Sequence, residues 1–353
     1  MTVLKLGSLF DGIGVFPLAA VHCGMEPVWA SEIEARPISI TKRHFPDMLH
    51  LGDITKISGA EIPPVDVITF GSPCQDLSQI GTRNGFAGKK SSLFYQAMRI
   101  IEEMRYATNG RYPAFCIWEN VAGAFSSNDR LDFAAMLSAF TGAEVSVPPR
   151  GWAHAGMVRG GCADTAWRLL DAQYWGEPAL VQRRKRVFVV ADFAGQRAGE
   201  VLFKPRTVLP FSTISGPGGL SATQRGGVPA AQTGRQVPIV RPFSLRRMRT
   251  MAQVGDQKGF CASFGRGGEP FPTLLASVTA PFSFWYEGEE RDGFLRALTP
   301  LECERLMGLP ENWTKYGCKD EDISDHARYR ALGNSIALPC AEYVMAGIAE
   351  VMN

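Results

Sequence analysis

Short apolar runs alternate with stretches of helical periodicity over the first third of the chain. This alternation is typical of a parallel sheet covered by helices. It predicts strands at residues 3–10, 27–31, 65–70 and 115–118, and helices at residues 16–23, 36–44 and 91–105. Two further strands are predicted at residues 167–174 and 187–192, and residues 147–162 are expected to form a Pro- and Gly-rich loop.

The regular pattern stops at residue 193, where Gly, Pro, Ser and Arg become frequent. It returns at Thr299-Pro300-Leu301-Glu302, which combines an N-cap, a first-turn proline and a capping-box glutamate. An amphipathic helix over residues 336–351 ends the chain. We therefore expect an α/β fold with a Rossmann-like, mostly parallel sheet. The larger domain is predicted at residues 1–192 and 327–353, and a smaller, irregular domain at residues 193–326, including a supporting helix segment at 296–313.

The composition is that of a globular chain, with 353 residues of which 45% are hydrophobic. No apolar stretch reaches membrane-spanning length, and the first residues lack the apolar core of a signal peptide. We expect a cytoplasmic monomer that does not contact a membrane. The eight cysteines have no close pair spacing, so the sequence predicts neither a metal site nor disulfides.

The formal net charge is only +2, but basic residues gather in one region. Between residues 195 and 286 there are eleven Lys and Arg residues and three Asp and Glu residues. Scattered arginines are commonly a solvated surface, whereas a local excess of positive charge in a separate module favours a polyanionic partner. Both interpretations stay open at this stage.

Cys74 lies in the loop Gly71–Ser78, directly after the predicted strand 65–70. Ligands of open α/β sheets collect at the carboxyl ends of such strands. Most free cysteines are buried and inert, so Cys74 by itself is only a candidate nucleophile.

Three features at the ends of the first strands favour a cofactor that contains adenosine. Phe10-Asp11-Gly12-Ile13-Gly14 is a strand-to-helix turn in which glycines permit close approach of a ligand. Glu32, about 20 residues further on, matches the acidic residue that accepts ribose hydroxyls. Asp53 follows Gly52 and could accept a hydrogen bond from an adenine amino group.

Glu119 ends an apolar strand, so partial desolvation should raise its pKa and suit it to share a proton near neutrality. The run Gln182-Arg183-Arg184-Lys185-Arg186 precedes another buried strand. Alternation places Gln182, Arg184 and Arg186 on one face. Their guanidinium groups could hold a carboxylate, a phosphate or a base oxygen.

These motifs, in this order, closely resemble those of the C5-cytosine methyltransferases that use S-adenosylmethionine. The resemblance is carried by the segments quoted above together with Pro73-Cys74-Gln75, Glu119-Asn120-Val121, residues 296–313 and Gly333-Asn334-Ser335. It covers nearly the whole chain except the basic middle region. The turn at Leu180-Val181-Gln182 departs from the family's usual Val-Pro-Gln, and we expect it to be rebuilt.

The resemblance implies that the larger domain binds S-adenosylmethionine and that residues 193–326 form a target-recognition domain for duplex DNA. Cys74 would attack C6 of a flipped-out cytosine, while Glu119, Arg184 and Arg186 would hold the base and assist the reaction. The implied cofactor-binding residues are Phe10, Gly12, Ile13, Gly14, Glu32, Ile33, Asp53, Ile54, Pro73, Leu93, Asn334, Ser335 and Ile336. The implied substrate-binding residues are Ser78, Arg83, Asn120, Gln182 and Thr273, of which Arg83 lies in a basic loop at residues 79–90 that would close on DNA.

Three alternatives remain open. The chain could be a tRNA cytosine methyltransferase of the same fold, although the Arg-rich region favours DNA. It could be a catalytically silent DNA-binding homologue, which the intact set of Cys74, Glu119 and Arg184 disfavours. A nicotinamide dehydrogenase is disfavoured by the incomplete glycine fingerprint. A cognate restriction endonuclease is a further candidate partner.

Overall fold

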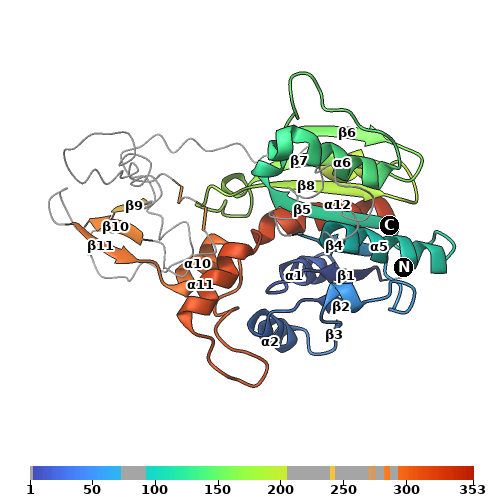
Figure 1. Cartoon of the computed structure of the whole chain (residues 1–353). Coiled ribbons are helices and arrows are strands. Elements are labelled where there is room, and N and C mark those ends of the chain that lie inside the picture. Colours follow the sequence, from blue (N-terminus) through green and yellow to red (C-terminus); the bar gives the residue numbers. More distant parts are fainter. Residues whose placement is uncertain are drawn as a thin grey trace.

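In the computed structural model, eight strands of the described residues form one sheet (Figure 1). The structure describes residues 3–72, 93–204 and 297–353, and between them residues 270–271 and 273–274 and the backbone of 239–242, 282–286 and 293–296. The strand order is β3-β2-β1-β4-β5-β8-β7-β6. The strands are β1 (Lys5–Leu9), β2 (Glu26–Ser31), β3 (Leu49–His50), β4 (Val67–Phe70), β5 (Phe115–Val121), β6 (Ala155–Arg159), β7 (Asp164–Asp171) and β8 (Lys185–Asp192).

Strands β1 to β5 are parallel, whereas β8 pairs antiparallel with both β5 and β7. The direction in which successive strands are added to the sheet reverses at the centre of its parallel part. Strand β2 lies on one side of β1, and β4 lies on the other side. Ligands of open α/β sheets bind outside the carboxyl ends of the strands at such a switch point. The predicted fold class is therefore confirmed, and the topology selects the ends of β1 and β4 as a binding edge.

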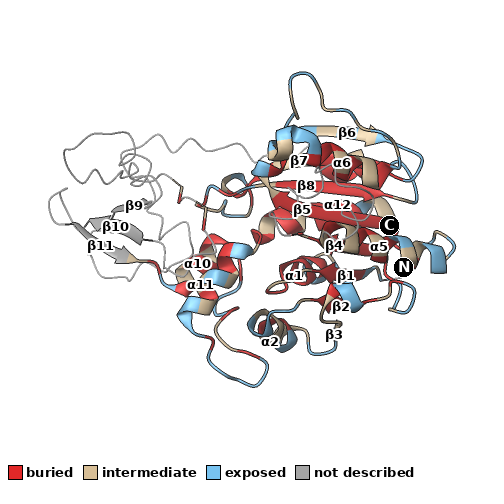
Figure 2. Cartoon of the chain, in the orientation of Figure 1, coloured by how far each residue is buried: buried red, intermediate tan, exposed pale blue. Residues whose placement is uncertain are grey.

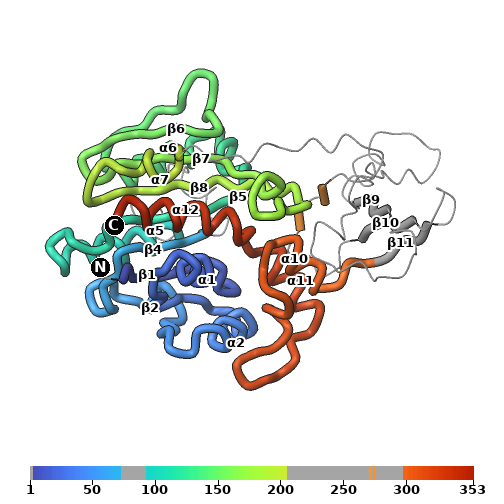
Figure 3. The backbone as a smooth tube through the Cα atoms, turned by 180° about the vertical axis from the view of Figure 1, so that it is seen from behind, coloured from blue at the N-terminus to red at the C-terminus, as the bar shows by residue number. Residues whose placement is uncertain are grey.

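Helices cover both faces of the sheet. One face carries α1 (Val15–His22), α7 (Ala198–Leu202) and α12 (Leu338–Met352), and Figure 3 shows α12 between the other two. The other face carries α5 (Leu93–Ala107) and α6 (Leu131–Thr141). A further helix, α2 (Ala35–His44), follows β2. Figure 2 shows that the central strands are buried almost throughout.

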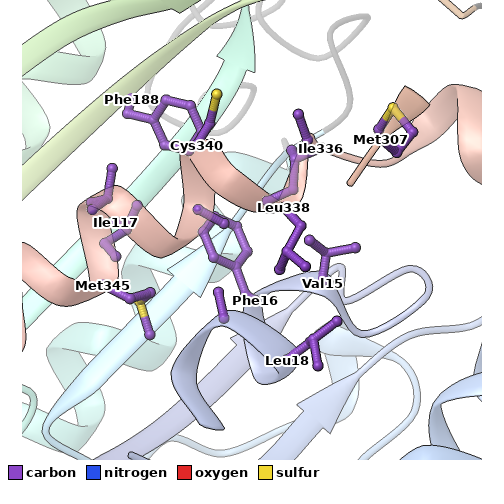
Figure 4. Packing of buried hydrophobic residues seen from close by; sticks show 14 of the residues in the cluster. Val15, Phe16, Leu18, Ile117, Phe188, Met307, Ile336, Leu338, Cys340 and Met345 are labelled. Atoms are coloured by element: carbon purple, nitrogen blue, oxygen red, sulfur yellow. The ribbon is translucent and has the colours of Figure 1, made fainter. Parts of the chain in front are cut away.

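The core is split by the sheet because successive strand side chains point to opposite faces. In β5, Phe115 and Ile117 join the cluster under α1 and α12, while Cys116 and Trp118 join the cluster under α5 and α6. Figure 4 shows Phe16 of α1 together with Leu338 and Met345 of α12 in the first cluster. Strands β1, β4, β5, β7 and β8 therefore each contribute to both cores, which explains the continuous apolar runs in the sequence.

The segment that follows the basic region packs on the same body. Helices α10 (Pro300–Leu306) and α11 (Asp325–Asn334) contribute Cys303, Leu306 and Leu332 to the cluster that holds α12. The expected capping box is present, since the Thr299 and Glu302 side chains each accept from the other's backbone. A separate sheet, β11 (Gly293–Ala297), β10 (Phe282–Tyr286) and β9 (Ile239–Pro242), lies beyond α10 and α11 in Figure 1.

Several elements were not predicted. The expected loop at 147–162 contains β6, which pairs antiparallel with β7 at the edge of the sheet, so the prediction of a loop was wrong there. Because its alternate residues are exposed, β6 has no continuous apolar run by which the sequence could predict a strand. The helices α6 and α11 and the two-residue strand β3 were also missed. Helix α7 lies beyond the boundary predicted at residue 192 and packs on β7, β8 and α12.

In the part of the chain that the structure describes, no single helix has the length and apolar character to cross a membrane. Helices α11 and α12 taken together have the length and composition of a membrane span, but the pair is bent. Much of α12 is buried against α1 and α7, as expected of a core helix.

We predict that Gly7→Ala destabilises the fold. A Cβ at this strand position would lie 2.1 Å from the Trp29 ring, which is fully buried. Overpacking of this kind costs about 1–3 kcal/mol, measurable by urea denaturation. Gly161→Ala is the control, because an added Cβ there meets no atom within 4 Å. Equal stability of the two variants would contradict this packing.

Candidate active site

The end of β4 is held by two side chains of the neighbouring strand β5. Trp118 Nε1 donates to Ser72 Oγ at 3.1 Å, and Asn120 Nδ2 donates to the Ser72 carbonyl at 3.0 Å. Asn120 is 2% exposed, and its Oδ1 accepts from the amide of Val121 at 2.8 Å. These bonds fix the chain two residues before Cys74. Asn120 was predicted to bind substrate, and in the structure it anchors this segment.

Glu119 lies beside this anchor. An added Cβ at Gly71 would be 3.2 Å from Glu119 Oε2, so the carboxylate is next to the backbone that leads to Cys74. Arg186 Nε lies 3.0 Å from Glu119 Oε1, although without the alignment of a hydrogen bond. Both side chains are nearly buried. Burial raises the pKa of Glu119, and the two nearby guanidinium groups of Arg186 and Arg184 oppose that rise.

Arg184 is 1% exposed and joins three segments that are far apart in the sequence. Its Nη1 donates to the Leu274 carbonyl at 2.9 Å, and Nη2 donates to the Gly333 carbonyl at 2.9 Å and to the Ser335 carbonyl. Desolvation lowers the pKa of Arg184 to about 9, and the neighbouring charge of Arg186 adds to this effect. Within the described part of the chain its Nε has no hydrogen-bond partner.

Alternate residues before β8 face inward, as the sequence pattern indicated. Gln182 and Arg184 are buried and Arg186 is nearly so, whereas Arg183 and Lys185 are exposed. Both amide atoms of Gln182 are buried and have no hydrogen-bond partner among the residues that the structure describes. An unsatisfied buried amide is costly, so Gln182 is a candidate to bind a ligand.

The predicted recognition region is tied to this segment through residues 271–274. Phe271 accepts from the Arg183 amide at 2.7 Å and donates to the Val181 carbonyl at 2.6 Å. Thr273 Oγ1 donates to the Arg183 carbonyl at 2.6 Å. The hydroxyl of Thr273, a predicted substrate residue, is therefore engaged by the backbone next to Arg184.

The glycine turn, residues 10–14, follows β1 at the switch point. Phe10, Gly12 and Gly14 have positive φ values of 54°, 60° and 78°. Glu32 Oε2 accepts from the Gly12 amide at 2.9 Å, while its Oε1 accepts from the amides of Ile33 and Glu34. Glu32 thus braces the turn, in addition to the ribose contact predicted from its position.

The other predicted cofactor residues differ in accessibility. Ile33 is 73% exposed, and Asn334 is exposed at the end of α11, so both are available to a ligand. Asp53 caps a short helix through Thr55, and these hydrogen bonds lower its pKa. Three residues are more enclosed, since Ile54 and Ile336 are buried in the core and Leu93 is packed against it. Ser335 offers its carbonyl to Arg184.

Several predicted residues lie outside the described residues. These are Cys74, Pro73, Ser78, Arg83 and most of the basic region. Among the described residues, no group of three or more His, Cys, Asp and Glu side chains is arranged to hold a metal ion.

The sequence analysis missed Asp11, which lies within the glycine turn. Both carboxylate oxygens of Asp11 are buried, and among the described residues neither makes a hydrogen bond of ordinary geometry. Burial raises its pKa to about 7; the charge of Glu32 adds to the rise, whereas the nearby hydroxyls of Ser8 and Thr41 oppose it. Asp11 stands in the quoted motif, but only the folded structure reveals that its carboxyl is desolvated.

The family model described as "C-5 cytosine-specific DNA methylase" matches residues 4–205 and 245–350, and the chain belongs to this family. The prediction that the chain is a DNA cytosine-5 methyltransferase is confirmed at the level of the family.

Relatives match over almost the whole chain. The type II methyltransferase M.HhaI of Haemophilus parahaemolyticus is 23% identical over 100% of this chain and 96% of its own length. M1.ScrFI of Lactococcus lactis subsp. cremoris is 27% identical over 99% of this chain and 78% of its own. A protein of Escherichia phage P1, named DNA N-6-adenine-methyltransferase, is 25% identical over 98% of this chain, which spans 61% of its length.

Solved structures share the fold. S. pombe Dnmt2 methyltransferase matches with a TM-score of 0.62 at 15% identity over all of both chains. A putative DNA modification methyltransferase from an E. coli prophage matches with a TM-score of 0.60 at 17% identity over 99% of both chains.

We predict that Asp11→Asn makes stability less sensitive to pH. The wild-type carboxyl, with a pKa raised from 3.8 to about 7, favours folding while protonated. That contribution is complete below about pH 4 and is lost as the pH rises to about 7. The variant should therefore gain stability over the wild type between pH 4.5 and pH 8 in chemical denaturation. An unchanged difference between the two proteins across that range would contradict the burial of a neutral carboxyl.

Proposed function

We propose that this protein transfers a methyl group from S-adenosylmethionine to C5 of a flipped-out cytosine in a specific duplex DNA sequence. The observation that supports the proposal most strongly is the buried group of Glu119, Arg184 and Arg186 at the carboxyl edge of the sheet. It lies next to the anchored segment Gly71-Ser72 that leads directly to Cys74. A buried acid and two cations beside the segment that leads to a cysteine fit addition to a cytosine ring.

In this mechanism the Cys74 thiolate forms a bond to C6 of the ring, and the electron pair of the C5–C6 double bond shifts to C5. Glu119 holds a proton at N3 and so stabilises the charge that reaches the ring. Arg186, 3.0 Å from Glu119, keeps that carboxyl oriented and adds positive potential. After C5 is methylated, a base removes the C5 proton, the double bond re-forms and Cys74 leaves.

S-adenosylmethionine would supply an electrophilic methyl group: the bond from its sulfonium sulfur to the methyl would break as the methyl joins C5, and S-adenosylhomocysteine would be the leaving group. Its binding is favoured by the glycine turn, where an added Cβ at Gly12 would meet no atom within 4 Å, so the backbone is open to a ligand. The exposed side chain of Ile33 offers an apolar surface for adenine beside Glu32. The buried carboxyl of Asp11 at this turn is a candidate partner for a polar group of the ligand.

The basic region favours DNA as the partner, since phosphate contacts by Lys and Arg supply most of the affinity for DNA. We assign residues 193–326 to target recognition and residues 1–192 and 327–353 to catalysis. The base lies inside a duplex and must be flipped out before Cys74 can reach it. We further propose a cytoplasmic monomer, with a cognate restriction endonuclease as the partner to be sought.

The decisive assay offers the purified protein duplex DNA of varied sequence and, separately, a tRNA pool, each with S-adenosylmethionine. Mass spectrometry of the nucleosides should find 5-methylcytosine in the DNA only. Methylation confined to tRNA would favour the RNA alternative. N6-methyladenine in place of 5-methylcytosine would overturn the proposed chemistry, and no product on either substrate would favour a silent homologue.

We predict that Cys74→Ser abolishes methyl transfer but leaves binding of S-adenosylhomocysteine unchanged, because a hydroxyl is a far weaker nucleophile than a thiolate. Turnover is followed by 5-methylcytosine formation and binding by calorimetry. Cys162→Ser is the control, since Cys162 is an exposed free cysteine and should keep full activity. Turnover by Cys74→Ser at the wild-type rate would rule out the assignment.

We also predict that Glu119→Gln lowers kcat by about 10²–10⁴-fold, the usual contribution of a positioned acid or base. The amide keeps the size of the side chain but cannot share the ring proton. Glu103→Gln is the matched control, because Glu103 pairs with Arg99 at 2.9 Å in a half-exposed position. Similar losses of activity in both variants would argue against a special role for Glu119.

A further inference from the structure

Trp313 connects the segment after α10 to the glycine turn. Its indole Nε1 donates to the Ile13 carbonyl at 2.8 Å, a contact between residues 300 positions apart. The side chain is buried, at 5% exposure. This is a second brace on the turn, from outside the parallel sheet, in addition to the one that Glu32 supplies at Gly12.

The indole is itself held rigidly. The His44 ring stacks on Trp313 with centroids 3.5 Å apart and planes 4° from parallel, and Phe45 meets it edge-on at 6.0 Å. His44 Nε2 lies 2.8 Å from the Trp313 carbonyl, so this nitrogen must carry the proton and donate it. Burial lowers the pKa of His44, which favours the neutral ring that this arrangement uses.

The turn that carries Trp313 is fixed by a fully buried carboxylate. Glu304 accepts from the amides of Asn312 at 2.8 Å and Thr314 at 2.9 Å, which flank the tryptophan. Arg328 of α11 balances its charge at 3.0 Å. Trp313 is therefore a stiff support, because moving it would break hydrogen bonds to a buried charge.

The hydrogen bond from Trp313 to Ile13 holds part of the glycine turn, whose backbone conformation is strained. The Ile13–Gly14 peptide is pinned at both ends, since its carbonyl accepts from Trp313 and its N–H donates to the Asp11 carbonyl at 3.2 Å. Phe10, only three residues earlier, has a positive φ, which costs free energy in a residue other than glycine. Without the indole bond the turn would also adopt other conformations. The apparent affinity for a ligand falls in proportion to the fraction of protein molecules whose turn is in the binding conformation.

We propose that Trp313 is a positioning residue for the methyl donor: its indole N–H holds the glycine turn in the conformation that binds S-adenosylmethionine. The inference rests on the proposed function, which assigns that turn to the donor. Trp313 lies in the segment that leads out of the basic region. The affinity for S-adenosylmethionine therefore depends partly on a segment that we assign to target recognition.

The test is Trp313→Phe, which keeps an aromatic ring against His44 but removes the N–H donor. Trp167→Phe is the matched control. Trp167 is buried to a similar extent, at 6% exposure, and donates one bond of 3.0 Å to the Ala153 carbonyl. It belongs to β7, separated from β1 by β4, β5 and β8. Both variants lose one indole hydrogen bond in a buried site.

We expect the Kd for S-adenosylhomocysteine, measured by calorimetry, to rise about three- to tenfold in Trp313→Phe and to stay unchanged in Trp167→Phe. The KM for S-adenosylmethionine should rise with it, while the KM for DNA stays constant. An unchanged Kd in a folded Trp313→Phe, or an equal rise in both variants, overturns the inference. Failure of the wild type to bind S-adenosylhomocysteine would instead overturn the proposed function.

A measurement on the wild type covers the case in which Trp313→Phe does not fold. Adding S-adenosylhomocysteine should slow amide hydrogen exchange over residues 311–316 as well as over the glycine turn, because the indole bond links them. Protection of the glycine turn without any change over residues 311–316 would overturn the proposed link.

Discussion

The arrangement of the site depends on one buried guanidinium, that of Arg184. Removing this charge from water is expensive, and the cost is offset by hydrogen bonds to the Leu274, Gly333 and Ser335 carbonyls. The first acceptor lies near the end of the recognition region and the other two at the link between α11 and α12, so satisfying one side chain brings these two segments together with the segment before β8. A side chain without charge could not hold three carbonyls in this way.

The same burial shapes the chemistry beside it. Arg184, Arg186 and Glu119 share a region of low dielectric, where charges interact more strongly than in water. Desolvation raises the pKa of Glu119 and lowers that of Arg184, so each group is closer to exchanging a proton than it would be at the surface. Groups of opposite charge whose pKa values are shifted by burial, at the carboxyl edge of an α/β sheet, are a common mark of catalytic sites.

Apolar runs and turn residues predicted the central strands, since β1, β4, β5 and β8 contribute side chains to both clusters and their sequences show it. They could not predict β6, because an edge strand exposes alternate residues. The inward face of Gln182, Arg184 and Arg186 followed from strand periodicity. The roles of Asp11 and Trp313 could not, because desolvation and a contact across 300 residues arise only when the chain folds.

The central claim is that this edge of the sheet delivers cytosine to Cys74, and duplex DNA containing 5-fluorocytosine tests it most directly. The fluorine cannot be removed as a proton, so the bond between the cysteine sulfur and C6 should persist after methyl transfer. We predict a denaturation-resistant complex that requires S-adenosylmethionine, with the adduct mapped by mass spectrometry to Cys74. An adduct on another cysteine would contradict this account. So would the absence of any complex on DNA whose unmodified form the protein methylates.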